Sequence, residues 1–185
     1  ATTFYTVITQ MPGCPADGGN YYCTANSFGP HGGEVFSNRV EAGEPMFFAI
    51  SGEAPGDVGT FEIEVSLHAG TCADPIDLTL ENASAFHIRG NTGGMPSTLT
   101  GSCGGAGPEV VYRVSDGGMA STIDSVVNGY DGFDPLLYAR TTCGGGGELG
   151  CGENDEHVPF TMSSPTFVIV DSVEGGDYSV TLYDS

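Results

Sequence analysis

The chain has 185 residues, and 39% of them are hydrophobic, enough for the core of one domain or of two small ones. Its net charge is −20, from 24 acidic residues against four Arg and no Lys, so nucleic acid and anionic membrane surfaces are unfavourable partners. No apolar run approaches the roughly 18 residues of a membrane helix, so we expect no membrane insertion. No signal peptide is visible, so in a secreted protein Ala1 would be a processed end.

The first 67 residues contain four segments typical of β-strands, at 4–9, 35–40, 46–51 and 61–67. In the last of these the odd positions, from Phe61 to Leu67, are apolar and would face a core, while the even positions would face water. The run 46–50 is more fully apolar, as in a central strand buried on both faces. Four strands could form one sheet, but one apolar face of that sheet would stay uncovered.

A second unit begins after a boundary near 68–71. It supplies eight further candidate strands, at 76–80, 86–88, 110–114, 122–127, 136–140, 158–162, 167–171 and 178–182. Helical periodicity is nearly absent, and the 30 Gly and 11 Pro imply many turns. The sequence therefore predicts an all-β protein with an antiparallel, jelly-roll-like β-sandwich fold, in which a partial module (1–69) precedes a complete one (70–185).

An internal repeat supports this division. The segments 4–9, 44–52 and 59–67 resemble 137–142, 164–172 and 176–184, and each copy contains a Gly-rich loop between two cysteines. The second copy has about 65 residues of strand-rich sequence ahead of it, which the first copy lacks. We therefore interpret the first unit as the back half of a module.

The six cysteines favour disulfides, because their number is even and no C-x-x-C motif occurs. Neighbours in sequence give three local pairs: Cys14 with Cys23, Cys72 with Cys103, and Cys143 with Cys151. This is the simplest of 15 connectivities. A zinc site is the alternative, although the four histidines show no paired ligand spacing. Disulfides predict an oxidising compartment, so we expect the protein outside the cell or on its surface.

Several motifs of the second unit occur together and in order: CADP (72–75), GPEVVYRV (107–114), DGFDPLLY (131–138), LGCGEND (149–155) and GDYSVTL (176–182). With them, the second unit resembles the bacterial pre-peptidase C-terminal domain family, in the disulfide-bearing form found as tandem modules in secreted myxobacterial proteins. Residues 1–67 resemble the family's back half. The resemblance implies a jelly-roll-like sandwich, usually non-catalytic, that is appended to secreted enzymes or repeated in surface proteins. Some members bind Ca²⁺.

Two acidic loops are candidate Ca²⁺ sites, one with Asp131 and Asp134 and the other with Glu153 and Asp155. Short acidic loops can place oxygen ligands at about 2.3–2.6 Å around Ca²⁺. Alternatively, these Asp residues are turn residues that bind their own backbone, and the high negative charge only keeps the surface solvated.

Catalysis finds little support, because G-x-S-x-G, H-E-x-x-H and P-loop motifs are all missing from the sequence, and we expect no enzyme. Close carboxylates of the kind that glycosidases use are the alternative that the sequence leaves open. Asn82 begins an Asn-Ala-Ser sequon, so it is a candidate glycosylation site. Exposed Tyr21, Tyr22 and Tyr130 could stack on a glycan ligand, or they could cover the ends of the sandwich.

The incomplete first module leads to the functional hypothesis. Its missing strands could lie in a longer natural chain, or the half module could fold back on the second unit, or a neighbouring subunit could supply strands. We favour the third explanation: a secreted, non-catalytic structural protein that self-assembles into a filament or surface layer. The alternative is a binding or targeting module for polysaccharide or protein, cut from a larger secreted protein such as a protease.

Overall fold

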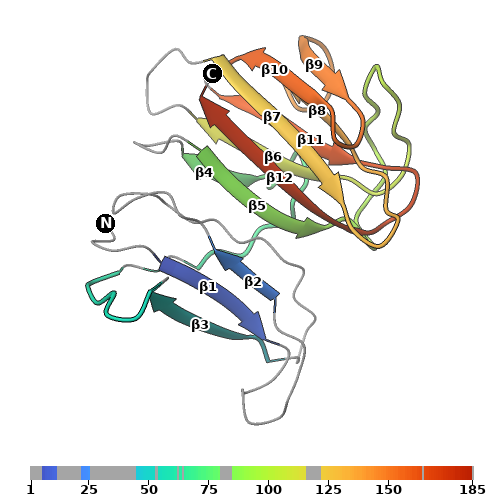
Figure 1. The fold of residues 1–185 in the computed structure, drawn as a ribbon. Helices are drawn as coiled ribbons and strands as arrows, with labels where there is room; N and C mark the ends of the chain where they lie inside the picture. The colour runs from blue at the N-terminus through green and yellow to red at the C-terminus, as the bar shows by residue number, and fades with distance from the viewer. Residues whose placement is uncertain are drawn as a thin grey trace.

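A computed structural model describes residues 6–11, 22–25, 45–52, 54–61, 63, 65–79, 85–115, 122–163 and 165–184, with the backbone alone in the first two ranges. All twelve elements in these ranges are β-strands (Figure 1). No helix in this part of the chain has the length and hydropathy needed to cross a bilayer.

The first unit contributes one three-stranded antiparallel sheet. Its strands are β1 (Thr6–Met11), β2 (Tyr22–Ala25) and β3 (Phe47–Gly52), in the order β2-β1-β3. The strand predicted at 35–40 lies outside the described residues.

The second unit contains two sheets that pack face to face. The four-stranded sheet has the order β10 (His157–Thr161), β7 (Thr122–Gly129), β12 (Asp177–Asp184) and β5 (Ala85–Asn91). The five-stranded sheet has the order β4 (Ile76–Thr79), β6 (Val110–Ser115), β11 (Thr166–Asp171), β8 (Leu136–Arg140) and β9 (Glu148–Gly152). The predicted all-β sandwich is confirmed. One pair departs from the antiparallel rule, because β4 runs parallel to β6.

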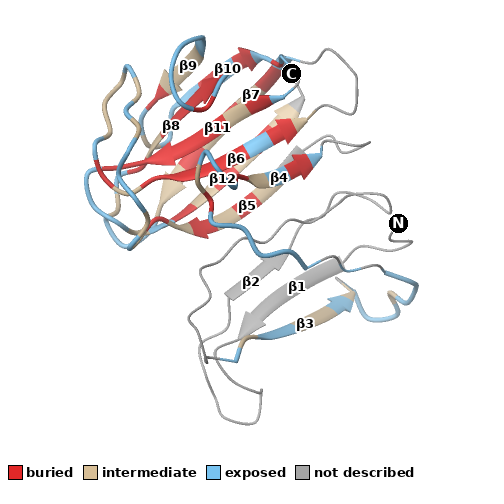
Figure 2. Cartoon of the chain, turned by 180° about the vertical axis from the view of Figure 1, so that it is seen from behind, coloured by how far each residue is buried: buried red, intermediate tan, exposed pale blue. Residues whose placement is uncertain are grey.

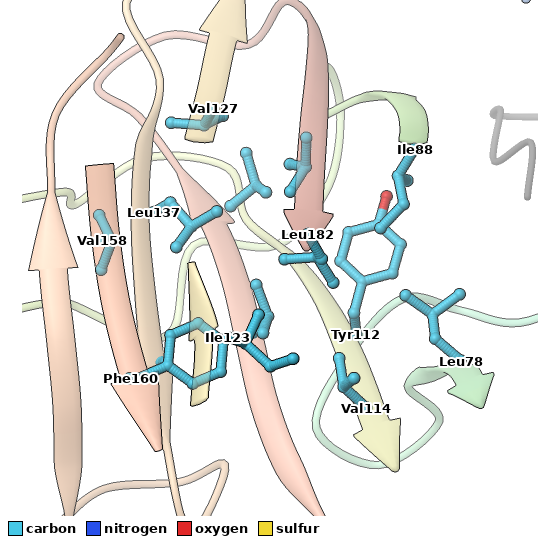
Figure 3. Close-up of a cluster of buried hydrophobic side chains, with 14 of the residues drawn as sticks. Leu78, Ile88, Tyr112, Val114, Ile123, Val127, Leu137, Val158, Phe160 and Leu182 are labelled. Atoms are coloured by element: carbon cyan, nitrogen blue, oxygen red, sulfur yellow. The ribbon is translucent and has the colours of Figure 1, made fainter. Parts of the chain in front are cut away.

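The main core of the second unit lies between its two sheets (Figure 2). Alternate residues are buried in β7 and β10, whereas β8 and β11 are buried along almost their whole length. Ile88 and Leu182 come from the four-stranded sheet, and Tyr112 and Leu137 from the five-stranded sheet; all four are almost completely buried (Figure 3). Burying one such side chain stabilises the fold by about 1.5–3 kcal/mol.

A hydrogen bond links the two layers inside this core. The hydroxyls of Tyr112 on β6 and Tyr178 on β12 lie 2.7 Å apart. Gly90 on β5 makes room for them, because a Cβ at this position would lie 2.3 Å from the Tyr178 hydroxyl oxygen. The position therefore requires glycine for reasons of space.

All eight strands predicted in the second unit exist, and β9 is an additional one that the sequence pattern did not reveal. Its glycines argue against a strand by propensity. They are required by packing, because a Cβ on Gly150 or Gly152 would lie 2.9 or 2.5 Å from a methyl group of Val158 on β10.

The small sheet of the first unit reproduces part of the five-stranded sheet. Thr9 of β1 pairs with Cys23 and with Ala49, as Tyr138 of β8 pairs with Cys151 and with Ile169. The order β2-β1-β3 is thus the counterpart of β9-β8-β11. The match holds when Cys14 is aligned with Cys143, so the predicted correspondence of 4–9 with 137–142 was wrong by four residues.

Candidate assembly surface

The segment 59–67 corresponds in the repeat to β12, but its surroundings differ. Phe61, Ile63 and Val65 take the places of Tyr178, Val180 and Leu182. The β12 residues are at most 1% exposed, whereas Phe61, Ile63 and Val65 are 49%, 54% and 76% exposed. The prediction of a strand at 61–67 with its odd positions in a core is therefore wrong at the described residues 61, 63 and 65–67.

The neighbours of β12 explain the difference. β12 lies between β5 and β7, which supply its hydrogen-bond partners, and it packs against the five-stranded sheet. Among the described strands, none pairs with the segment 61–67. Segment 61–67 has the alternating pattern of a core strand. Each of its apolar side chains that stays in water lacks the stabilisation of about 1.5–3 kcal/mol that burial would provide.

Strand β3 shows the same contrast with its counterpart β11. β11 pairs with β6 on one side and β8 on the other, and Val168 is completely buried. β3 pairs with β1 alone among the described strands, and Phe47 and Phe48 are 38% and 47% exposed. The prediction that 46–50 is buried on both faces is wrong for the same reason as that for 61–67.

The exposed segment is joined to the second unit by a fixed connection. Asp74 accepts a hydrogen bond from the Ala69 amide at 2.7 Å and lies 3.1 Å from Nδ1 of His68. The Val111 amide of β6 donates to the carbonyl of Gly70 at 2.9 Å. Gly70 has a φ of 64°, which favours glycine. The exposed segment, which ends at Leu67, is therefore attached to the sandwich at a defined point.

The cysteines of the second unit are not paired locally. The disulfides join Cys72 to Cys143 and Cys103 to Cys151, with Cα–Cα distances of 5.6 and 5.7 Å. The predicted Cys72–Cys103 and Cys143–Cys151 pairs are therefore wrong, as is the zinc alternative for these four thiols. Cys14 and the side chain of Cys23 lie outside the described residues.

The geometry of the β8–β9 hairpin explains why the predicted pair of Cys143 and Cys151 does not form. Cys151 pairs with Tyr138 within the ladder, whereas Cys143 lies in the loop beyond Arg140 and Glu148. Cys151 lies three positions after Glu148, a span of about 10 Å along the strand, and a disulfide needs a Cα–Cα distance below about 7 Å.

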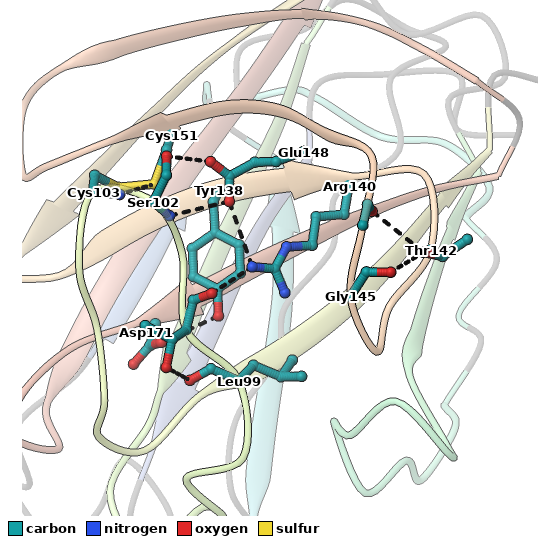
Figure 4. A network of polar contacts seen from close by, with 12 residues as sticks. Leu99, Ser102, Cys103, Tyr138, Arg140, Thr142, Gly145, Glu148, Cys151 and Asp171 are labelled. Carbon is teal, nitrogen blue, oxygen red and sulfur yellow. Dashed lines mark hydrogen bonds and ion pairs between the residues drawn. A yellow bond between two sulfur atoms is a disulfide. The ribbon is translucent and has the colours of Figure 1, made fainter.

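A polar network surrounds the Cys103–Cys151 disulfide (Figure 4). The Ser102 amide and hydroxyl both donate to Glu148. Arg140 donates to the Thr100 carbonyl and lies 3.4 Å from Glu148. These contacts hold the loop 99–105 against the β8–β9 hairpin, so the network has a structural role.

A buried carboxylate lies beside this network. Asp171 is completely buried and accepts hydrogen bonds from the Tyr138 hydroxyl at 3.1 Å and from the Ser172 amide at 2.6 Å. Burial raises the pKa of Asp171, and buried Glu109 adds to this increase. Burial, followed by the charge of Asp171, also raises the pKa of Tyr138, so this phenol stays neutral.

The two predicted acidic loops are neighbours in space. The Asn154 side chain accepts a hydrogen bond from the Gly129 amide at 2.9 Å, and the Asp155 amide donates to the Val127 carbonyl. This contact places the loop of Glu153 and Asp155 beside the end of β7.

Both loops are turns. Asp131 and Asp155 have φ values of 55° and 64°, which Asp tolerates in turns. Asp134 follows the first turn. Among the described residues, no three His, Cys, Asp or Glu side chains gather closely enough to hold a metal ion. The calcium site at these loops stays a prediction.

The other predicted sites have mixed outcomes. Asn82 and Tyr21 lie outside the described residues, as does the side chain of Tyr22. Tyr130 is 37% exposed, but its ring is covered by the guanidinium of Arg89, 4.9 Å from the ring centroid, and its hydroxyl accepts a hydrogen bond from Arg89. A glycan would have to share this ring with Arg89.

One side-chain cluster was missed in the sequence. Asp124, His157 and Tyr183 meet on the outer face of the four-stranded sheet. They come from three strands, so no local spacing connects them. Only the pairing of β7 with both β10 and β12 brings them together.

Comparison with known proteins adds little. No protein-family model matches the chain, and no curated protein does. Among solved structures, the mitogen of Yersinia pseudotuberculosis is similar with 14% identity and a TM-score of 0.37, covering 54% of this chain and 84% of that chain. At this level the likeness carries no inference about function.

Proposed function

We propose that the protein is a secreted structural subunit that joins copies of itself through the incomplete first unit. The exposure of Phe61, Ile63 and Val65, at positions that are buried core in the repeat, is the observation that supports this proposal. A strand with this pattern is stabilised once a sheet edge supplies hydrogen bonds and a core covers its apolar side. The two disulfides fit this setting, because they indicate an oxidising compartment outside the cytoplasm.

The proposed acceptor is strand β5 in a second copy of the chain. In the repeat, β5 is one of the two neighbours of β12, and it forms an edge of the four-stranded sheet. A segment 61–67 added there would extend the sheet by one strand. The apolar side of this added strand would then lie on the same inner face of the sheet as Ile88. It would cover the edge of the sandwich core next to β4.

Charge favours this pairing over others. In β5, His87 and Arg89 alternate with the buried Ile88 and therefore lie on the outer face. Burial lowers the pKa of His87, so Arg89 is the cation on this face at neutral pH. In an added strand, Glu62 and Glu64 would lie on the same face, and each opposite-charge pair contributes about 0.2–1 kcal/mol.

The contact joins different surfaces on the two copies, so it is heterologous. Such contacts form rings when the rotation closes and filaments when it does not. A heterologous contact of this kind is compatible with the proposed filament or surface layer.

Sedimentation velocity over a concentration series tests the proposal. We expect the wild type to self-associate with increasing concentration and Ile63→Asp to remain smaller at every concentration. Val173→Asp is the matched control, because Val173 is 81% exposed in the second unit, outside the proposed contact. Wild-type protein that stays monomeric, or equal assembly by Ile63→Asp, would contradict the proposal.

The acceptor strand is tested by charge reversal. Arg89→Glu should weaken association, whereas Arg113→Glu on β6, which pairs with Asp77, should not. Equal effects of the two changes would rule out β5 as the acceptor.

A further inference from the structure

Three potential ligand atoms form a small triangle on the outer face of the four-stranded sheet. The distance from Asp124 Oδ2 to His157 Nδ1 is 2.9 Å, that from the Tyr183 hydroxyl to Asp124 Oδ2 is 3.0 Å, and that from the hydroxyl to His157 Nδ1 is 2.7 Å. Every side of the triangle therefore lies between 2.7 and 3.0 Å.

The sheet fixes this arrangement. Asp124 on β7 lies directly opposite Tyr183 on β12 and opposite Pro159 on β10, and His157 is two residues from Pro159 on the same face. The inward neighbours Ile123, Val158 and Leu182 are at most 3% exposed, so they anchor all three strands in the core. The triangle therefore depends on the fold and not on a flexible loop.

The dimensions fit a metal ion with ligands at right angles. With bonds of about 2.0–2.1 Å, adjacent ligands of an octahedron lie about 2.8–3.0 Å apart, and those of a tetrahedron about 3.3–3.4 Å apart. The sides of the triangle are closer to those of an octahedral face than to those of a tetrahedral one. Imidazole, carboxylate and phenolate together suit a transition metal better than Ca²⁺, which prefers oxygen ligands alone.

We propose that Asp124, His157 and Tyr183 form a binding site for a transition-metal ion of octahedral or tetragonal preference, such as Cu²⁺ or Ni²⁺. The ion would bind Oδ2, Nδ1 and the phenolate oxygen. Water would occupy the positions that face the solvent, because the His157 side chain is 63% exposed.

The second oxygen of Asp124 supports the proposal. Oδ1 is buried and accepts no well-formed hydrogen bond among the described residues, although the Ser125 amide interacts with this carboxylate and helps to lower its pKa. Burial of a charged carboxylate is costly, and a cation bound at Oδ2 would offset part of this cost. The net charge of −20 also raises the local concentration of cations.

The protonation states are compatible with exchange of a proton for the ion. Burial opposes ionisation of Asp124, but the hydrogen bonds from His157 and Tyr183 outweigh it and hold the pKa of Asp124 below its ordinary value. Burial, together with the hydrogen bond to Asp124, raises the pKa of Tyr183, so the free phenol is protonated at neutral pH. When the ion binds, the phenol O–H bond breaks, the metal–oxygen bond forms and the proton passes to water.

Titration of the full chain with Cu²⁺ tests the site, followed by calorimetry and visible absorption. We expect one ion per chain, a phenolate-to-copper charge-transfer band, and tighter binding as pH rises because a proton is released. Tyr183→Phe should abolish the band, and His157→Ala should weaken binding at least about tenfold. His68→Ala, at the histidine beside Asp74, should change neither.

The opposite results are equally clear. Cu²⁺ binding that is unchanged in both Tyr183→Phe and His157→Ala would overturn the proposal, as would wild-type protein without a charge-transfer band. Thermal melting of each variant without metal shows whether it is folded. If either variant is unfolded, Asp124→Asn replaces it, with the same expected weakening of at least about tenfold.

Discussion

The carboxylate of Asp74 holds the connection between the two units, with Oδ1 3.1 Å from Nδ1 of His68 and Oδ2 accepting the Ala69 amide at 2.7 Å. The hydrogen bond from Ala69, followed by that from His68, lowers the pKa of Asp74. An acid with a lowered pKa in the folded state stabilises it above its ordinary pKa, here 3.8, and this contribution is lost as pH falls through the folded value.

Asp74→Ala should therefore loosen the connection at neutral pH. We expect faster cleavage within 68–74 by a broad-specificity protease, identified by mass spectrometry of the fragments. Asp77→Ala is the control, because Asp77 pairs with Arg113 on neighbouring strands of the sandwich and does not touch the connection. Equal cleavage rates for the two variants would show that Asp74 does not fix it.

The hydrogen bond between Tyr112 and Tyr178 should be important for stability. Tyr112→Phe leaves the hydroxyl of Tyr178 in a buried site without this partner, at a cost of about 1–3 kcal/mol. Gly90→Ala should cost a similar amount, because the new Cβ would overlap the Tyr178 hydroxyl. Urea unfolding measures both. Tyr130→Phe, which removes an exposed hydroxyl, should change the free energy of unfolding by less than about 0.5 kcal/mol.

The disulfide pairing can be read from a tryptic digest without reduction. Cleavage after the four Arg places Cys72 in 40–89, Cys103 in 90–113, and both Cys143 and Cys151 in 141–185. The observed pairing joins all three fragments, whereas local pairing would leave 141–185 free. A second digest with a Glu-specific protease also cuts after Glu64, Glu81, Glu109 and Glu148. It should yield two separate pairs, the peptide of Cys72 with that of Cys143 and the peptide of Cys103 with that of Cys151.

The two disulfides should also differ from local ones in their effect on stability. They close loops of 71 and 48 residues, and in the chain-entropy model each contributes about 4 kcal/mol. Replacing both Cys72 and Cys143 with Ser should lower the free energy of unfolding by about this amount. A loss below about 1 kcal/mol would contradict the model for this chain.

Strand alternation predicted β7, β10 and β12 of the second unit well because each of these strands has one buried face, whereas β8 and β11 are buried on both faces and were predicted from their apolar residues. Val180 and Leu182 are buried while Thr181 between them is less so, and this pattern is visible in the sequence. The same pattern gave a wrong prediction at Ile63 and Val65. Alternation indicates that a segment can form a strand with one apolar face, but it does not show whether neighbouring strands are present.

Contacts between distant segments could not be read from the sequence. Cys72 and Cys143 meet because the sheets bring residue 72 beside the end of β8, and the cluster of Asp124, His157 and Tyr183 needs two strand pairings in register. Spacing along the chain carries no information about either.

Buried Asp171 gives a prediction for pH dependence. Its pKa is raised in the folded state, so between the ordinary value of 3.8 and the folded value the native state binds more protons than the unfolded state. The free energy of unfolding therefore falls as pH rises through this window. Asp171→Asn removes this contribution, so the stability of the wild type relative to the variant should fall as pH rises above 3.8. Tyr138→Phe removes a hydrogen bond to the carboxylate and should raise the pKa of Asp171 further, so in this variant the fall in the free energy of unfolding should extend to higher pH than in the wild type. Urea unfolding at several pH values measures these differences, and parallel curves for all three proteins would show that Asp171 does not titrate in this range.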